Sequence, residues 1–489
     1  MRKLFLISMF VLAFGTVAAS GQNYYSLTWR KFNQTGPDLQ QIGRISVKKS
    51  GEINASRWSI GCECLDRNYS NFEAYKDYLP ELGVGYARIQ SGWMKTEKKE
   101  GVYDFSWLDP IVDGLNTRHI KPWMCLSYTN PIYYPNADAS LGSQIFEDGP
   151  VMDAWLKFVE KVILRYKGRI TCYEVWNEPN IKVNAEHPER YANLLVRTCR
   201  LIRKKDPDAK IVAFALASFD LKFFKDVLDM VKKKGGTDLF DYVSLHKYYE
   251  NPDNSDVDFP LFREALDAFN PSIGILQGES GCPSELGWAH ALKFVEWDEY
   301  RQAKVILRRM GCDFAMSHPC SIFTIADNNC REIHFRQSFG LLCTDLEGTV
   351  IYRKPSFYAV KHFVNLLPDE ITAGEMEYSA NTARRIKLVG LQKGDKTVGV
   401  MYWYCDNAPS RELSWDRIEL TVEKFRMKKP VLVEPITGRV YELAMWHHSP
   451  NATFTRYNDV PIWDSPLLLI DRNEIGFEDL SNAYHTNEF

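Results

Sequence analysis

From about residue 56, short apolar runs alternate along the chain with stretches whose hydrophobic residues follow a helical spacing. In one such stretch, Leu194, Leu195, Leu201 and Ile202 fall near one helical face. This alternation is typical of βα units, in which helices cover parallel strands. The expected strands are 57–65, 86–90, 121–128, 171–178, 210–217, 242–248, 273–279 and 321–325. Eight such units predict an α/β fold, a (β/α)8 TIM barrel over residues 56–368.

The pattern changes after residue 368. Strand-like runs follow one another without a convincing helical period, and turn residues separate them. The runs are 397–404, 417–422, 430–433 and 467–470. They predict a small all-β sandwich domain over residues 369–473, followed by a polar tail at 474–489. Residues 21–55 are polar and weakly patterned, and could add a strand to the sandwich domain.

The first twenty residues have the pattern of an export signal. Arg2 and Lys3 precede an apolar stretch at 4–14, and small residues at 17–20 form an expected cleavage zone. The apolar stretch is shorter than the 18 or so residues that span a bilayer. No Cys stands directly after the cleavage zone, where a lipid could be attached. No later segment is long and apolar enough to span a membrane. We therefore expect a secreted or periplasmic protein without a membrane anchor.

Composition narrows the function classes. A formal net charge of -3 gives no general attraction to nucleic acid or membranes, so neither is an expected partner. The 11 cysteines are an odd number without a disulfide framework, although one or two disulfides remain possible in an oxidising compartment. No Cys or His grouping has the spacing of a zinc site, so we expect neither a metal nor a cofactor. The sequence does not indicate the oligomeric state.

Two glutamates stand at the ends of expected strands. Asn177 and Glu178 end an apolar run just before Pro179, and Glu279 ends the run at 273–279. In a parallel barrel these strand ends meet at the face where the βα loops form the reaction site. Hydrolysis of a glycosidic bond uses two carboxyl groups, one as acid/base and one as nucleophile. The alternative, that either glutamate caps a helix or forms a surface salt bridge, leaves their matching positions unexplained.

Further phrases support a resemblance to a known group of enzymes. They are Tyr86-Ala87-Arg88-Ile89-Gln90, Ser244-Leu245-His246-Lys247-Tyr248 and Lys354-Pro355-Ser356-Phe357-Tyr358. With the Asn-Glu pair, they make residues 56–368 resemble a clan A glycoside hydrolase, most like family 39, with families 5 and 51 as near alternatives. Known members of family 39 include β-xylosidases. The later β region resembles the sandwich domain that often follows the barrel in this clan.

The resemblance implies roles for individual residues. It makes Glu178 the acid/base and Glu279 the nucleophile, with Arg88 near Glu279 to keep that carboxylate ionised and oriented. It places His246 and Tyr248 in the sugar-binding subsite, where Asn177 would bind a hydroxyl.

Two other side chains can be assigned with less support from the pattern. Trp93 is a candidate sugar platform, although packing is the commoner role of such a residue. Glu174 lies four residues before Glu178 on one strand and faces the same side. A structural role, with Arg88 as a possible partner, is favoured for Glu174.

The sequence departs from the clan at the end of the eighth strand. Many members have a Trp there, as the floor of the subsite, whereas this chain has Phe323-Thr324-Ile325-Ala326-Asp327. Asp327 could bind a sugar hydroxyl instead, or a Trp could come from another loop. The departure weakens any substrate taken from family 39.

The sequence therefore predicts a retaining glycosidase acting on a poly- or oligosaccharide, with a β-xylosidase-like exo action favoured. An endo-glycanase and an arabinofuranosidase of the same clan are the alternatives within enzymes. A barrel that only binds carbohydrate is the alternative outside them. The presence of Glu178, Glu279, Asn177 and Arg88 together argues against it, since binding alone does not need that set.

Overall fold

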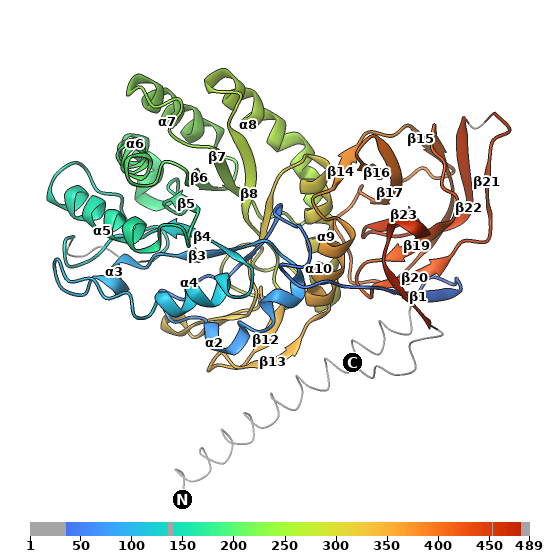
Figure 1. Cartoon of the computed structure of the whole chain (residues 1–489), viewed down its shortest axis with the longest axis horizontal. Helices are drawn as coiled ribbons and strands as arrows, with labels where there is room; N and C mark the ends of the chain where they lie inside the picture. Colours follow the sequence, from blue (N-terminus) through green and yellow to red (C-terminus); the bar gives the residue numbers. More distant parts are fainter. Residues whose placement is uncertain (1–35, 135–139, 452, 481–489) are drawn as a thin grey trace, which may run out of the picture.

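The computed structural model describes residues 36–134, 140–451 and 453–480. The expected export signal at 1–20 lies outside these residues. A closed barrel of eight parallel strands forms the larger part of the molecule, as the sequence predicts (Figure 1). Its strands are β2 (Trp58–Gly61), β3 (Tyr86–Gln90), β4 (Lys121–Leu126), β5 (Cys172–Val175), β6 (Lys210–Ala217), β7 (Tyr242–His246), β8 (Gly274–Ser280) and β9 (Cys320–Ile322).

Helices surround the barrel and bury their apolar faces on it. They are α2 (Phe72–Tyr75), α3 (Trp93–Thr96), α4 (Asp109–Asn116), α5 (Pro150–Tyr166), α6 (Pro188–Lys205), α7 (Leu221–Lys233), α8 (Ser255–Phe269), α9 (Glu299–Ala315) and α10 (Pro355–Leu366). The Asp220 side chain caps α7 by accepting from Phe223 N at 3.0 Å. None of the described helices is both long and apolar enough to cross a membrane.

Two β-hairpins between β9 and α10 are additions that the sequence pattern did not reveal. One pairs β10 (Asn328–Cys330) with β11 (Phe335–Gln337), and the other pairs β12 (Leu342–Thr344) with β13 (Val350–Arg353). Strands of three or four residues are too short to show an alternating pattern. Both hairpins follow the carboxyl end of β9, so they extend the loops of the barrel mouth.

The C-terminal domain consists of two antiparallel sheets, in agreement with the predicted sandwich. The larger sheet has the order β14-β16-β17-β23-β19-β20-β1-β24, and the smaller one β15-β18-β22-β21. Their strands are β1 (Gln41–Ile45), β14 (Ile371–Gly374), β15 (Tyr378–Ala380), β16 (Ile386–Lys393), β17 (Lys396–Tyr404), β18 (Asp416–Glu423), β19 (Pro430–Glu434), β20 (Arg439–Glu442), β21 (Trp446–His448), β22 (Phe454–Ile462), β23 (Leu467–Asp471) and β24 (Phe477–Asp479).

Both ends of the described chain enter the larger sheet. Strand β1 pairs with β20 and with β24, so residues 41–45 belong to the β domain although they precede the barrel (Figure 1). The expected tail at 474–489 is wrong for residues 477–479, because β24 forms hydrogen bonds with β1. The polar composition of β24 hid it from the sequence pattern, since an edge strand needs little apolar surface.

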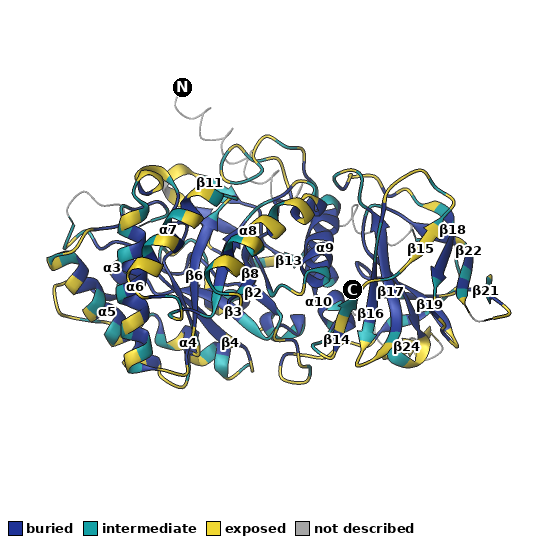
Figure 2. Ribbon diagram, turned by 90° about the horizontal axis from the view of Figure 1, so that it is seen from above, coloured by how far each residue is buried: buried dark blue, intermediate teal, exposed yellow. Residues whose placement is uncertain are grey.

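Helix α9 lies between the two domains and is buried along nearly its whole length (Figure 2). Its Arg308 donates from Nε to Asp253 at 2.8 Å, and Trp403 of β17 donates to the same carboxylate at 3.1 Å. A buried carboxylate with several donors ties barrel, helix and β domain together. The eleven cysteines, all within the described residues, are free thiols, so the one or two disulfides left open by the sequence do not form.

Candidate active site

Glu178 and Glu279 meet at the carboxyl end of the barrel. Glu178 lies three residues after the end of β5, and Glu279 is the second-last residue of strand β8. One carboxyl oxygen of Glu178, one of Glu279 and a ring nitrogen of His246 all lie within 4.8 Å of one another. Both glutamate side chains keep about a tenth of their surface accessible, 12% for Glu178 and 11% for Glu279. The structure thus brings together the two residues that the sequence selected, while their chemical roles stay predictions.

The backbone around both glutamates is unusual. Trp176 and Glu178 have left-handed conformations, with φ of 72° and 51°. Such conformations in residues other than Gly are strained by about 1–3 kcal/mol each and concentrate at functional sites. Beside Glu279, a Cβ on Gly278 would lie 1.9 Å from Ser244 Oγ and 3.1 Å from His246 Nε2. Only glycine lets β8 approach β7 closely enough for His246 to reach both glutamates.

Arg88 of β3 organises the floor of the site. Its fully buried guanidinium donates to Glu174 at 2.7 Å, to Glu279 at 3.0 Å and to Asn177 Oδ1 at 2.7 Å. The Nη1 atom that reaches Glu279 also lies 2.8 Å from Glu63 Oε1. Arg88 is therefore the partner of Glu174, as the sequence suggested, and it orients the expected nucleophile. Burial alone would lower the pKa of Arg88. The neighbouring carboxyl groups outweigh this effect and raise the pKa of Arg88 well above its usual value.

His246 lies between the carboxylates. Its Nδ1 is 3.5 Å from both Glu178 Oε1 and Glu279 Oε2, and its Nε2 is 3.9 Å from Glu174 Oε1. Burial disfavours the imidazolium, but the surrounding carboxylates outweigh it and raise the pKa of His246 to about 9. At neutral pH His246 is therefore a cation, and with Arg88 it balances two of the carboxylates.

The pKa values of the acidic groups of the site shift in different directions. Burial raises the pKa of Glu178 above its usual value, and the negative charge of Glu279 raises it further, against an opposing contact from His246. This is the shift that a general acid needs near neutral pH. Burial also acts on Glu174, but Arg88 and His246 outweigh it and lower the pKa of that carboxyl.

Hydrogen bonds fix the remaining groups that the sequence placed here. Tyr248 donates from its hydroxyl to Glu279 Oε1 at 2.6 Å. Asn177 donates from Nδ2 to the Tyr128 hydroxyl at 2.9 Å while accepting from Arg88. Burial and the nearby Glu279 carboxylate raise the pKa of Tyr248 well above its usual value, so it remains a donor. Each oxygen of Glu279 thus has its own donor.

The two glutamates line a small pocket of about 320 Å³. Its walls come from the loops that follow β4 to β8 and from the hairpin β10–β11. The lining residues are Leu141, Glu178, Ala217, Ser218, His246, Lys247, Tyr248, Glu279, His290, Ala291, Gln337 and Phe339. A pocket of mixed polarity with two carboxyl groups at one wall suits a hydroxyl-rich ligand.

Of the expected sugar-binding residues, His246 and Tyr248 line this pocket, whereas Arg88, Asn177, Trp93 and Asp327 do not. Trp93 is fully buried, donates from Nε1 to Glu97 at 2.6 Å and stacks on Phe158 with ring centroids 5.7 Å apart. Asp327 is 1% exposed and accepts from Lys354 Nζ at 2.7 Å. Their assignment as substrate contacts is corrected: Trp93 is a packing residue and Asp327 is half of a buried ion pair.

The Asp327–Lys354 pair instead joins three loops of the mouth. Asp327 accepts from Gly340 N at 2.9 Å, and Lys354 Nζ donates to Ser284 Oγ at 2.9 Å and to Ser338 O at 3.2 Å. These contacts hold Phe339, whose ring packs edge-on against Tyr248 at 5.8 Å. An aromatic residue therefore does arrive from another loop, as Phe339 rather than as a Trp.

Sequence reasoning missed Glu63, which follows β2 and is 2% exposed. It lies against Arg88 and accepts from Gln90 Nε2 at 3.3 Å. Burial raises the pKa of Glu63 to about 8, although Arg88 opposes this. The only available signal was its position near the end of the first expected strand, 57–65, within a phrase, Cys62-Glu63-Cys64, that has no recognisable pattern.

Within the described residues, one group of side chains has the geometry of a possible cation site, namely Glu178, His246 and Glu279. The same three groups are sufficient for acid/base and nucleophilic chemistry without an ion.

Comparisons with known proteins agree with the geometry. The family model "Glycosyl hydrolases family 39" matches residues 51–259, a range that includes Glu178 and His246 but ends before Glu279. A β-xylosidase of Caldicellulosiruptor saccharolyticus is 26% identical over 244 residues, 43% of this chain and 47% of that protein. An intracellular exo-α-(1->5)-L-arabinofuranosidase of Acetivibrio thermocellus is 33% identical over 89 residues, 17% of each chain. The chain thus spans less than half the length of these curated relatives.

The fold is shared over a longer range. A family 39 glycoside hydrolase from Bacteroides cellulosilyticus WH2 aligns with a TM-score of 0.63 and 17% identity, covering 86% of this chain and 81% of that one. This alignment includes the barrel and extends beyond it, so the combination of a barrel with a β domain is also found in that protein.

Proposed function

The chain has the fold of a clan A glycoside hydrolase and is most like family 39, and we propose from this that it is a retaining exo-glycosidase. In the first step Glu178 would protonate the leaving oxygen while Glu279 attacks the anomeric carbon and forms a glycosyl-enzyme. In the second step Glu178 would remove a proton from a water molecule whose oxygen attacks the anomeric carbon, and the bond between that carbon and Glu279 breaks. The substrate is a carbohydrate in either step.

One observation carries the proposal. Oxygens of the two carboxyl groups lie within 4.8 Å of each other. Retaining enzymes keep their carboxyl groups about 5–5.5 Å apart, whereas inverting enzymes need roughly 6.5–9.5 Å to admit a water molecule. The environments of the two residues support the same division of roles, since burial raises the pKa of Glu178 while Arg88 and Tyr248 both donate to Glu279.

The shape of the pocket favours action at a chain end. Its volume of about 320 Å³ is small, and the hairpin β10–β11 and the segment containing His290 and Ala291 form walls around it. Such a pocket suits a terminal sugar better than the middle of a chain. The similarity to a β-xylosidase supports a β-xyloside as the first substrate to test, and the similarity to an arabinofuranosidase makes an α-L-arabinofuranoside the second.

A panel of aryl glycosides tests the proposal. We expect one sugar to be released with retained anomeric configuration, which NMR of the first product detects before mutarotation. Glu279→Ala should abolish release, whereas Glu147→Ala, which removes an exposed glutamate paired with Arg190, should not. Hydrolysis with inverted configuration, or full activity of the Glu279 variant, would show that the proposed mechanism is wrong.

We further propose that residues 1–20 direct the chain out of the cytoplasm. The support is the charged start, apolar stretch and small-residue zone of this segment. Expression of the full chain in a bacterial host should yield a periplasmic protein whose N-terminus lies near residue 21, as measured by intact mass. A chain that keeps residues 1–20 and stays in the cytoplasm would contradict this.

A further inference from the structure

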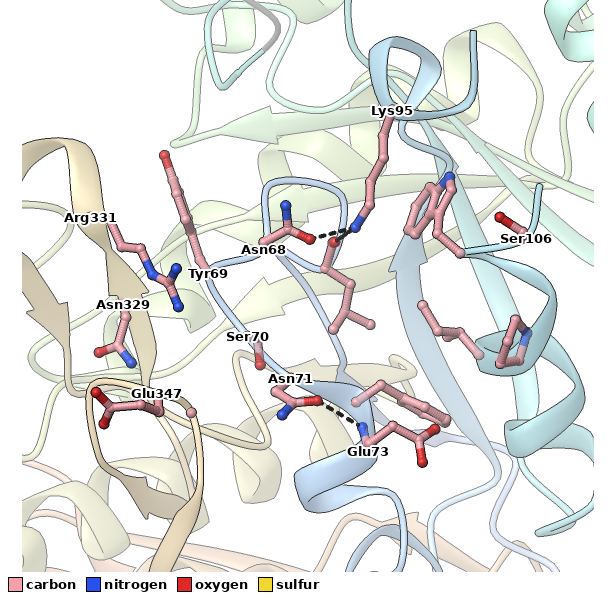
Figure 3. Close-up of a pocket in the computed structure, with 16 residues that line it drawn as sticks. Asn68, Tyr69, Ser70, Asn71, Glu73, Lys95, Ser106, Asn329, Arg331 and Glu347 are labelled. Atoms are coloured by element: carbon pink, nitrogen blue, oxygen red, sulfur yellow. Dashed lines mark hydrogen bonds between the residues drawn. The ribbon is translucent and has the colours of Figure 1, made fainter. Parts of the chain in front are cut away.

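A second depression, of about 590 Å³, lies at the barrel mouth and contains neither catalytic glutamate (Figure 3). Its floor is the segment Asn68 to Asn71. Arg331 and Glu347 stand on one side of this floor, and Lys95 and Ser106 stand on the other. The depression is larger than the pocket of about 320 Å³ that holds Glu178 and Glu279.

Two aromatic side chains, Tyr69 and Trp107, are half-buried in its lining. Trp107 is held in place because its Nε1 donates to Thr96 Oγ1 at 3.1 Å. A Cβ on Gly92 would lie 2.7 Å from the Trp107 ring, so the ring lies directly against the backbone. Rigid aromatic surfaces that are partly accessible suit the apolar face of a sugar ring.

The polar groups of the depression are also fixed. Lys95 Nζ donates to Leu65 O and to Asn68 Oδ1, each at 2.7 Å. Asn329 donates from Nδ2 to Asp345 O at 2.8 Å, yet its Oδ1 is buried and has no partner among the described residues. A buried acceptor without a partner is unfavourable unless a ligand or water supplies a donor.

The charges of the depression are balanced, which favours a neutral ligand. Its charged residues are Lys95 and Arg331 on the positive side and Glu73 and Glu347 on the negative side. A phosphate or sulfate group would meet as many anions as cations here. An uncharged oligosaccharide would meet aromatic surface, on which its apolar face can stack, and amides and charged groups, which can form hydrogen bonds with its hydroxyl groups.

Only a thin wall separates the depression from the catalytic pocket. Arg67 lies over the rings of Tyr69 and Tyr128, 5.5 Å and 5.3 Å from their centroids, and Tyr128 accepts from Asn177. The hairpin β10–β11 forms another part of the wall, with Asn329 lining the depression and Gln337 lining the pocket. The depression and the catalytic pocket therefore share the wall that this hairpin forms.

We propose that this depression is an accessory subsite for a neutral oligosaccharide, namely the part of the substrate remote from the bond that is cut. The proposal rests on the proposed glycosidase function, and it makes longer oligosaccharides better substrates than aryl glycosides of the same sugar. Trp107 and Tyr69 supply stacking surface, while Asn68, Asn329 and Arg331 supply hydrogen bonds.

The test compares a six-unit oligosaccharide with an aryl glycoside of the sugar that the panel identifies. Trp107→Ala should lower kcat/KM for the oligosaccharide by about 3- to 10-fold. It should change kcat/KM for the aryl glycoside by less than twofold. Trp107→Phe, which keeps an aromatic surface, should recover most of the loss. Trp446→Ala in β21, a half-buried tryptophan of the β domain, is the matched control and should change neither value.

Equal losses on both substrates, or no loss on the oligosaccharide, would overturn the proposal. If Trp107→Ala does not fold, Arg331→Ala removes an exposed side chain of the same lining and should show a smaller loss on the oligosaccharide alone.

A binding measurement separates this proposal from the glycosidase function. Full-length Glu279→Ala protein, and the same protein with Trp107→Ala, would be run in native gels containing soluble arabinoxylan, mixed-linkage β-glucan or galactan. Retardation by one polymer that Trp107→Ala abolishes supports the subsite even if every aryl glycoside is inert. Retardation that is unaffected by Trp107→Ala, or no retardation by any polymer, would contradict it.

Discussion

The two ends of the barrel are built by the same strands from opposite kinds of side chain. Strand β3 contributes Tyr86 at its amino end and Arg88 two residues later, and β7 contributes Tyr242 and then His246. At the amino end, the strand residues Trp123, Val212 and Leu276 form an apolar cluster separate from the main core. At the carboxyl end, buried charges replace it.

The difference separates stability from chemistry along one set of strands. The amino end surrounds a cavity of about 510 Å³ lined by side chains such as Trp123, Tyr242 and Leu276. The side chains of this end contribute to the stability of the fold by burying apolar area. The charges of the carboxyl end are desolvated and depend on one another, so removing one leaves its partners uncompensated. Substitutions at the two ends should therefore fail in different ways.

The largest effect is expected from removal of the nucleophile. Glu279→Ala cannot form a glycosyl-enzyme, so kcat should fall by roughly 10⁴-fold or more. Azide should restore turnover, because a small anion can enter the space left by the carboxylate and attack the anomeric carbon directly. Initial rates with and without azide measure this. Full activity in the variant without azide would remove Glu279 from the mechanism.

Glu178→Ala should show an effect that depends on the leaving group. Loss of a general acid lowers rates by about 10²- to 10⁴-fold. Dinitrophenyl glycosides leave without protonation, so their first step should be preserved while substrates with poor leaving groups lose activity. The pKa of Glu178 is raised, so wild-type activity should decline as pH rises through that value, and Glu178→Ala should lose this alkaline decline. A variant with an equal loss on all leaving groups would contradict the acid role.

Much of this arrangement could be read from the sequence, for physical reasons. The eight strands were visible because buried parallel strands are continuous apolar runs. Glu178 and Glu279 stood out because a charge at the end of such a run has few structural explanations. The family resemblance then placed Arg88, His246 and Tyr248, and the structure brings all three to the site.

The remaining features depend on tertiary contacts. Trp93 and Asp327 have the right residue types near strand ends, but only the packing shows that one is stacked among aromatic rings and the other is paired with Lys354. Glu63 was missed because its position follows from the approach of β2 to β3 and not from any local pattern. Phe339 comes from a loop whose course the sequence does not determine.

Paired substitutions test whether the two ends of the barrel differ in their effect on activity and stability. Arg88→Met leaves the buried Glu174 carboxylate without its cation, which should lower the free energy of unfolding by about 3–5 kcal/mol and abolish activity. Leu276→Ala enlarges the cavity at the amino end and should lower the free energy of unfolding by about 2–5 kcal/mol with kcat nearly unchanged. Urea unfolding and initial rates measure both. Loss of activity in a folded Leu276→Ala protein would show that the two ends are coupled.

The smallest effect is expected from Glu63→Gln. The pKa of Glu63 is raised to about 8 in the folded protein, so the carboxyl keeps a proton that the unfolded chain releases at lower pH. The stability gained from that proton is complete below the unfolded pKa and is lost as pH rises through about 8. Glutamine is neutral at every pH, so the variant should lose less stability between pH 5 and pH 9.

Urea unfolding at both pH values measures this difference, which is at most about 1.4 kcal/mol per pH unit. Glu370→Gln, an exposed substitution, should follow the wild type. Identical pH dependence in all three proteins would show that Glu63 is ionised throughout. Because the charge of the site is unchanged at neutral pH, kcat of Glu63→Gln should there remain within severalfold of the wild type.

The identity of the nucleophile is tested most directly by trapping the glycosyl-enzyme. Three carboxylates, Glu63, Glu174 and Glu279, contact Arg88, but only Glu279 lines the pocket. Glu178→Ala incubated with a dinitrophenyl glycoside should accumulate a covalent adduct, because its hydrolysis lacks a general base. Peptide mass spectrometry should then find one added sugar on Glu279. A sugar on Glu63, on Glu174 or on any other residue would contradict the mechanism proposed here.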